Sequence, residues 1–267
     1  MHPMLNIAIK AARRAGSVIL RHSGQLDRLT IESKGRNDFV SEVDHQAEAE
    51  IIDTIQRAFP DHSILAEETG AKENSASSYQ WVIDPLDGTT NFLHGYPQFA
   101  VSIAVLNNKR LDQAVVFDPL RNELYTASRG EGAKLNDRRI RVSGVHRLEN
   151  ALIGTGFPYK SYEHLEVWID CFRALLPKTS GVRRAGSAAL DLAHVASGRL
   201  DGFWEMDLKP WDIAAGCLLI QEAGGLFSDF NGGQEYMSSG NIVAGNPKIF
   251  DGVFQSIKEY LPPELRR

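Results

Sequence analysis

The feature that most constrains this sequence is an apolar segment that runs into two aspartates three residues apart. Residues 81–92 read WVIDPLDGTTNF, and the two acids are Asp84 and Asp87. The apolar start is typical of a buried β-strand, and Pro85 opposes regular continuation of that strand. A glycine and two threonines follow, at a position where a helix could begin. The segment therefore predicts a strand, a tight turn and a helix start, with carboxylates at the turn.

The atoms of this turn could bind a metal ion and a phosphate group. Magnesium sites typically combine one or two carboxylates with the phosphate of a substrate. Gly88 adds no side-chain bulk, so the amides of Gly88 and Thr89 could approach a phosphate at the positive end of a helix. A turn without a ligand, with Asp and Gly in their favoured positions, accounts for the same residues. The segment alone leaves both interpretations open.

Two further acidic segments bear on that choice. Glu67 and Glu68 follow a predicted strand at 63–66, and Asp212 opens a predicted helix. Each has a structural interpretation by itself, since Asp212, for example, could serve only to cap its helix. Together with the aspartates after residue 83 they place carboxylates at three element ends, which is the material of a shared metal site. The residues alone do not establish that these ends meet in space.

The first 145 residues predict two helices on a largely antiparallel sheet. Apolar residues at helical spacing indicate a first helix that ends near Gly24. Ser41 can cap a second helix, with Asp44 three residues on, and this helix stops at Pro60. Strands are expected at 63–66, 80–84, 99–106, 114–117 and 123–127. Most connections between them are too short for crossover helices, which favours antiparallel pairing.

From residue 146 strands and helices alternate, which indicates an α/β half. Strands are expected at 151–155, 202–205 and 242–244, and helices at 163–176, 187–197, 211–223 and from 247 onward. No linker rich in Pro, Gly or Ser separates the halves, and 267 residues suffice for a large core. We therefore expect a mixed α+β and α/β chain, with an N-terminal part at 1–145 and a C-terminal part at 146–267, in one compact unit.

Composition excludes several classes of function. The net charge of −5 does not attract nucleic acid or an anionic membrane. Cys171 and Cys217 give neither a disulfide framework nor a metal-ligand spacing, and they fit a reducing cytosol. The start of the chain has no signal-peptide pattern, and no apolar run approaches the roughly 20 residues that cross a bilayer. The expectation is a cytoplasmic protein without membrane association.

Four runs of residues resemble the signature motifs of the inositol monophosphatase family. They are AEE at 66–68, DPLDGTTNF at 84–92, WDIAAG at 211–216 and QEAGG at 221–225. The resemblance covers nearly the whole chain, and it is nearest to the bacterial SuhB-type branch through RNEL at 121–124 and RAGSAALD at 184–191. It implies a layered α-β-α-β-α sandwich of the inositol monophosphatase and fructose-bisphosphatase type.

The resemblance also implies up to three magnesium ions in each active site. The residues carried over as metal ligands are Glu67, Asp84, Asp87, Asp212 and the carbonyl of Leu86. Asp84 would be shared between two metals, and a third, weaker magnesium would lie near Glu67 with Asp44 in reach through water. Lithium is expected to inhibit, because members of the family lose a magnesium site to it.

The catalytic and substrate-binding roles are carried over in the same way. The catalytic residues would be Glu67, Asp44 and Thr89, which direct a water molecule that attacks phosphorus in line without a covalent phosphoenzyme. The substrate contacts would be Gly88, Thr89, Ala188, Glu205 and Lys34. Glu205 could equally be a strand-end glutamate, and the loop after Lys34 is one residue shorter than in animal members, which puts its geometry in doubt. Inositol-1-phosphate is the leading substrate, with glycerol-2-phosphate and other small esters beside it.

Two other functions compete with this interpretation. A haloacid-dehalogenase-type phosphatase needs two aspartates separated by one residue, whereas two residues separate Asp84 from Asp87. A protein-binding role follows from the SuhB-type resemblance, whose members are associated with Nus factors, RNA polymerase and antitermination of ribosomal RNA transcription. The basic pairs that could serve such contacts are Arg13–Arg14, Arg138–Arg139 and Arg183–Arg184, although solvated arginines or a homodimer interface explain them too.

Overall fold

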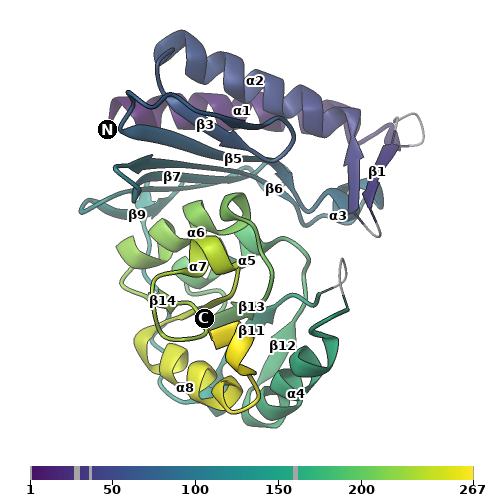
Figure 1. Ribbon diagram of the computed structural model, residues 1–267, viewed down its shortest axis with the longest axis vertical. Coiled ribbons are helices and arrows are strands. Elements are labelled where there is room, and N and C mark those ends of the chain that lie inside the picture. The colour runs from purple at the N-terminus through teal and green to yellow at the C-terminus, as the bar shows by residue number, and fades with distance from the viewer. Residues whose placement is uncertain (1, 27–30, 36–37, 159–161, 267) are drawn as a thin grey trace.

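The computed structural model describes residues 2–26, 31–35, 38–158 and 162–266, and it has five layers (Figure 1). A pair of helices lies outermost, followed by an eight-stranded sheet, a second helical layer, a five-stranded sheet and a last pair of helices. The expected mixed, layered α-β-α-β-α fold is confirmed. Three clusters of buried apolar side chains lie between successive layers and tie them together.

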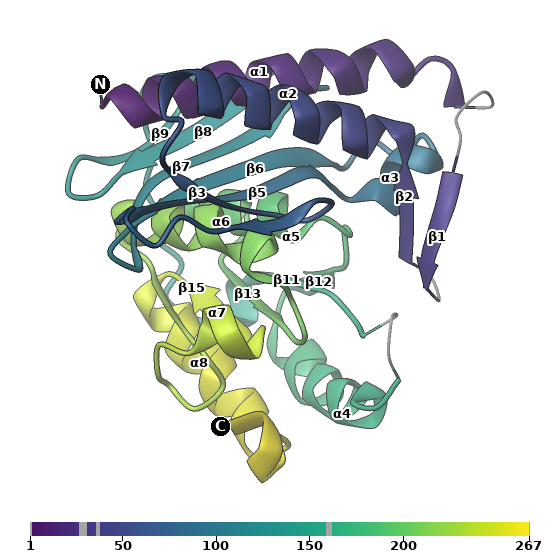
Figure 2. The same cartoon turned by 45° about the horizontal axis from the view of Figure 1, so that its top comes forward.

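The outermost helices are α1 (Pro3–His22) and α2 (Glu42–Ala58), which pack side by side on one face of the large sheet (Figure 2). The buried face of α1 is lined by small and branched apolar residues at helical spacing, which lets α2 and the sheet approach closely. The expected cap of α2 is present. The Ser41 hydroxyl accepts a hydrogen bond from the Val43 amide, and the Asp44 carboxylate accepts one from the Ser41 amide.

The large sheet has the order β10-β9-β8-β7-β6-β5-β3-β4. Its strands are β3 (Ser63–Ala66), β4 (Gly70–Lys72), β5 (Tyr79–Asp87), β6 (Ala100–Asn107), β7 (Arg110–Asp118), β8 (Glu123–Ser128), β9 (Gly132–Leu135) and β10 (Arg138–Arg139). All pairs are antiparallel except β3 with β5. The strand predicted to end at Asp84 instead continues to Asp87. A bulge between these two residues absorbs the proline, because Asp84 lies opposite Ser102 and Asp87 opposite Ala100.

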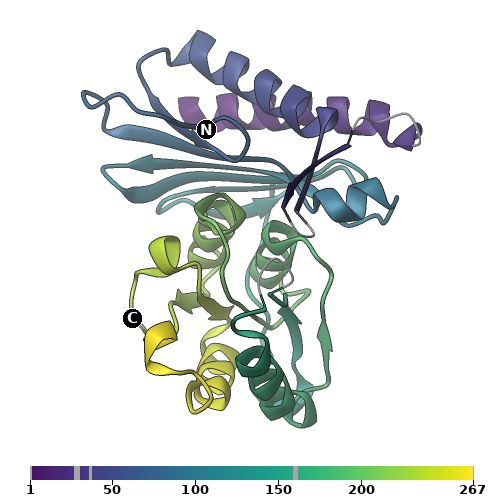
Figure 3. The same ribbon diagram turned by 45° about the vertical axis from the view of Figure 1, so that its right-hand side comes forward.

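The second helical layer consists of α5 (Ala188–Ala196) and α6 (Pro210–Glu222), which lie between the two sheets (Figure 3). The small sheet has the order β12-β11-β13-β15-β14, with strands β11 (Leu152–Thr155), β12 (Gly181–Arg183), β13 (Gly202–Glu205), β14 (Leu226–Ser228) and β15 (Ile242–Gly245). It is mixed, since β11 pairs parallel with β12 and β13 whereas β15 pairs antiparallel with β13 and β14. Helices α4 (Leu165–Leu175) and α8 (Pro247–Lys258) cover its outer face.

Three small elements complete the described chain. Strands β1 (Ile31–Gly35) and β2 (Asp38–Ser41) form a hairpin, which Figure 2 shows at one side of the molecule near α3 (Thr89–Leu93). Helix α7 (Tyr236–Ser239) lies beside α6. None of the described helices has the length and apolar character needed to cross a membrane.

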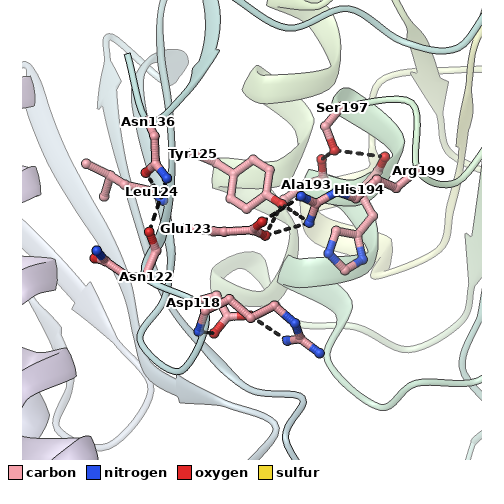
Figure 4. A network of polar contacts seen from close by, with 11 residues as sticks. Asp118, Asn122, Glu123, Leu124, Tyr125, Asn136, Ala193, His194, Ser197 and Arg199 are labelled. Atoms are coloured by element: carbon pink, nitrogen blue, oxygen red, sulfur yellow. Dashed lines mark hydrogen bonds and ion pairs between the residues drawn. The ribbon is translucent and has the colours of Figure 1, made fainter. Parts of the chain in front are cut away.

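A polar network joins the large sheet to the chain that follows α5 (Figure 4). Arg199 donates hydrogen bonds to both carboxylate oxygens of Glu123 on β8 and to the hydroxyl of Tyr125. That hydroxyl in turn donates to Glu123 over 2.9 Å. The ring of His194 on α5 lies edge-on to Tyr125, and burial, followed by the charge of Arg199, lowers the pKa of His194 to about 4. The histidine is therefore neutral at physiological pH.

Candidate active site

The ends of six elements meet around a cavity of about 630 Å³. They are the end of β3, the end of β5 with the start of α3, the N-terminus of α5, the end of β13 and the N-terminus of α6. The predicted acids lie on these ends because β5 pairs with β3 inside one sheet while α5 and α6 pack against the same sheet. The three segments whose convergence the residues left open therefore line one cavity.

Three carboxylates form the centre of this site. One oxygen from each of Asp84, Asp87 and Asp212 lies within 4.8 Å of the others. Asp84 is buried, and its pKa is raised well above the ordinary value, first by burial and then by the negative charges of Glu67 and the two other aspartates. Like charges held this closely in a buried site repel one another, so the arrangement favours a bound cation.

Hydrogen bonds from the second helical layer fix two of these side chains. Asp87 Oδ2 accepts from the hydroxyl of Ser187 at 2.6 Å and from the amide of Ala189 at 2.8 Å. Burial nevertheless raises the pKa of Asp87 to about 6. Asp212 Oδ2 accepts from the amide of Lys209 at 2.6 Å, so this residue does cap α6, as its alternative interpretation expected. This cap does not remove Asp212 from the trio, because one of its oxygens still lies within 4.8 Å of the oxygens of Asp84 and Asp87.

Glu67 and Leu86 lie at the edge of the trio. Glu67 directly follows β3, is half-buried and lines the cavity, and its charge contributes to the raised pKa of Asp84. Its carboxylate is not one of the three that lie within 4.8 Å of one another. Leu86 is buried in the bulge of β5, where its amide donates to Asp84 Oδ1 and its carbonyl accepts from Thr89. The bulge thus turns a backbone carbonyl and two carboxylates toward one region.

Thr89 and Asp44 make direct contact although 45 residues separate them. The Thr89 hydroxyl lies 3.0 Å from Asp44 Oδ1 and 3.1 Å from the Leu86 carbonyl, with both in acceptor positions. Asp44 uses its other oxygen in the cap of α2, so this cap also positions a residue of the cavity wall. Burial is the main cause that raises the pKa of Asp44, against hydrogen bonds from Ser41 and Thr89 that lower it.

Gly88 holds a backbone conformation that requires glycine. Its φ is +94°, and a Cβ at this position would lie 2.8 Å from the carbonyl oxygen of Gln98. The residue precedes the first turn of α3, so Gly88 and Thr89 line the cavity next to the trio. A side chain here would displace the backbone just before β6, at Gln98 and Phe99, or the carbonyl of Gly186 before α5.

The other predicted substrate contacts divide into two groups. Ala188 is the first residue of α5, Glu205 ends β13, and both line the cavity. Burial and the charge of Asp191 raise the pKa of Glu205 well above its usual range. Lys34 lies in β1, but its side chain is outside the described part of the structure.

The comparisons with known proteins agree with this geometry. The model of the Inositol monophosphatase family matches residues 1–261. The chain belongs to the inositol monophosphatase family. A relative from Pseudomonas aeruginosa, described as Nus factor SuhB, is 54% identical over 271 residues, with 100% of each chain covered. Extragenic suppressor protein suhB from Bartonella henselae has a crystal structure with a TM-score of 0.95 at 42% identity, covering 97% of this chain and 100% of that one. An inositol monophosphatase from Anabaena (Nostoc) has a TM-score of 0.85 at 40% identity, covering 98% and 97% of the two chains.

Membership of the inositol monophosphatase family implies phosphatase activity, and the family generally uses magnesium. The donors at this site fit that metal. Three carboxylates and a carbonyl supply hard oxygen atoms, which magnesium prefers to nitrogen or sulfur. Both cysteines are buried and lie outside the cavity lining, so no thiol faces the described cavity.

Three residues of the cavity wall were not singled out from the sequence. Ser187 holds Asp87, and the side-chain amide of Asn91 donates to the carbonyls of Gln98 and Ala185, which joins α3 to the loop before α5. Asp191, on α5, lies in the wall with only 2% of its surface exposed. Ser187 begins a predicted helix and could have been found as a cap, whereas Asn91 and Asp191 lie inside the quoted motifs without a local signal for a role of their own.

Proposed function

We propose that this protein hydrolyses phosphate monoesters of small polyols with magnesium as cofactor, and that inositol-1-phosphate is its leading substrate. The observation that carries the proposal is the trio of Asp84, Asp87 and Asp212, within 4.8 Å of one another in the wall of a 630 Å³ cavity. Such a site concentrates hard oxygen ligands where a phosphate group can enter.

The residues around the trio have separate tasks in this proposal. The trio, with Glu67 and the Leu86 carbonyl, holds the metal ions, with up to three as the number expected for each site. Magnesium, when bound, supplies positive charge beside the phosphoryl oxygens and makes a nearby water more acidic. The amides of Gly88 and Thr89 hold the phosphate in line with that water.

Proton transfer is assigned to Glu67, Thr89 and Asp44. The Thr89 hydroxyl donates to Asp44, so the lone pairs of Thr89 Oγ1 are free to accept a hydrogen bond from the attacking water. The half-buried Glu67 carboxylate takes up the proton of this water as the new P–O bond forms. The ester P–O bond breaks on the opposite side, and the leaving alkoxide takes a proton from solvent. No covalent enzyme intermediate is required.

The first test measures phosphate release from inositol-1-phosphate while magnesium is titrated, with and without lithium. The expected result is release that requires magnesium and falls when lithium is added. Asp84→Asn serves as the control for activity from a contaminating phosphatase. A folded wild-type protein that releases no phosphate at any magnesium concentration would overturn the leading substrate.

A second function is favoured by the description of the relatives as Nus factor SuhB. We propose that the chain also binds Nus factors or RNA polymerase in transcription antitermination, as a cytoplasmic homodimer. An affinity capture with Asp84→Asn as bait separates the two functions, because binding through an outer surface does not need the metal site. Capture of these partners by both forms supports the second function. Failure of both forms to bind purified RNA polymerase and Nus factors contradicts it.

A further inference from the structure

Two carboxylates in the cavity wall stand apart from the metal trio. They belong to Asp191 on α5 and Glu205 at the end of β13. The structure assigns neither carboxylate a hydrogen bond or an ion-pair partner within the described part of the chain. A buried carboxylate is normally paired, because leaving it unpaired costs free energy. Asp191 has only 2% of its surface exposed, and it lines the cavity.

The fold makes room for the Glu205 side chain at the end of β11. Gly154 and Gly156 lie two residues apart on β11 and directly after it, so they face the same side. A Cβ on Gly156 would overlap the carboxylate of Glu205, and one on Gly154 would lie 3.7 Å from the Cβ of Asp191. Glu205 therefore approaches the cavity over backbone that carries no side chain, and Asp191 packs at van der Waals distance from the same strand.

The surrounding charges favour a ligand with hydroxyl groups over a further cation. Arg184 lies over the ring of Phe157 at 4.3 Å, and its positive charge acts on both Asp191 and Glu205. The only described group of three acids suited to a metal is the trio, and neither Asp191 nor Glu205 belongs to it. Burial raises the pKa of both acids, which favours neutral hydroxyls over a charged ligand as their hydrogen-bond partners.

We propose that Asp191 is a specificity-determining residue, which accepts a hydrogen bond from a second substrate hydroxyl beside the one that Glu205 receives. The pair would select esters of polyols that present two hydroxyls away from the phosphate. The inference rests on the proposed phosphatase function and adds the part of the substrate that the site recognises.

The test compares the wild type with Asp191→Asn on four esters: inositol-1-phosphate, glycerol-2-phosphate, phenyl phosphate and phosphoethanolamine. The expected change is a fall of about tenfold to a hundredfold in the ratio of kcat/KM for inositol-1-phosphate to that for phenyl phosphate. Most of the change should be in KM, because a hydrogen bond to a remote hydroxyl is present in the ground state and the transition state alike.

Thermal unfolding without substrate distinguishes a binding role from a structural one. Asp191→Asn should raise the melting temperature, since it removes an unpaired buried carboxylate. Asp229→Asn is the matched control. Asp229 is also buried, but it accepts hydrogen bonds from the amides of Asn231, Gly233 and Glu235, so its replacement should lower the melting temperature.

Each other outcome overturns a definite statement. An unchanged kcat/KM ratio, or an Asp191→Asn variant that is less stable or unfolded, contradicts the role of Asp191 while an active wild type leaves the phosphatase function standing. A wild type that prefers phosphoethanolamine contradicts the recognition of hydroxyls. A wild type inactive on all four esters overturns the phosphatase function and this inference with it.

Discussion

Two groups of acids in this protein have opposite surroundings. Asp118 and Glu123 on the large sheet are each paired with an arginine, at 2.6 Å from Arg121 and within hydrogen-bond distance of Arg199. The hydrogen bonds from Arg199 lower the pKa of Glu123. In the cavity, by contrast, burial and neighbouring acids raise the pKa of Asp84. Arginines satisfy the first two acids, and Arg199 joins the large sheet to the chain after α5, whereas the cavity acids lie against one another.

The difference indicates that the acids of the cavity lower the stability of the native state. A carboxylate that meets an arginine or several amides stabilises the native state, whereas one surrounded by other acids destabilises it until a ligand arrives. Active sites commonly lower stability in this way, because groups arranged for a ligand are not arranged for each other. The comparison can be tested by changing matched residues in the two groups.

The largest expected effect is on activity, from the pair Asp84→Asn and Asp118→Asn. Each wild-type residue has only 1% of its surface exposed, so the two changes are matched in burial. Asp84→Asn should lower kcat/KM by more than about 100-fold, beyond the effect typical of residues that only orient metal ligands. It should raise the melting temperature in chelator, because it removes a repelled charge. Asp118→Asn should lower the melting temperature and change kcat/KM only a few-fold. A stabilised Asp118→Asn variant would contradict the comparison.

The next effect is on the pH dependence of stability without metal. The folded-state pKa of Asp87 is raised from 3.8 to about 6. Its contribution to the free energy of unfolding is therefore fully present below about pH 3.8 and is lost as the pH rises through 6. The pKa of Glu123 is lowered from 4.5, so its contribution is present above that value and is lost as pH falls through the folded value.

Unfolding in urea with chelator, at several pH values between 4 and 7, measures this difference. Asp87→Asn should remove part of the stability loss between pH 4 and 6, whereas Glu123→Gln should cost more stability at pH 7 than at pH 4. Magnesium should stabilise the wild type more at pH 7 than at pH 5, because protons and metal compete for the same carboxylates. If the stabilities of the two variants changed with pH in the same way, Asp87 and Glu123 would not have opposite effects on stability, and the comparison would be wrong.

The sequence predicted the elements that local signals determine. Alternation and helical spacing located α1, α2, β3, β13 and α6 to within about two residues, and the Ser41 cap was found with its partner Asp44. Strands β1, β2, β4, β9, β10, β12 and β14 were missed because they are short, with none longer than five residues, so each carries little of the alternation that predicts a strand. The division at residue 145 stays a prediction.

The candidate site was predicted in a similarly uneven way. Asp84 and Asp87 follow an apolar strand, which is a local signal, but their approach to Asp212 depends on how α6 packs against the large sheet. The bulge in β5 was missed, since Pro85 was interpreted as the end of the strand and not as a residue within it. Asp191 resembles any acid on a helix until the packing of α5 places it in the cavity wall.

The smallest expected effects come from single hydrogen bonds in the paired network. Arg199→Met removes the bonds to Glu123 and Tyr125, and it should cost about 1–2 kcal/mol, a value kept low because 42% of the Arg199 side chain is exposed. Tyr125→Phe removes one hydroxyl and should cost about 0.5–1.5 kcal/mol.

The free energies of unfolding of both variants and of the double variant form a mutant cycle. The double variant should lose less than the sum, because both changes break the same Arg199–Tyr125 bond. Additive losses would mean that the two side chains stabilise the sheet independently, and the network would then be a set of separate contacts.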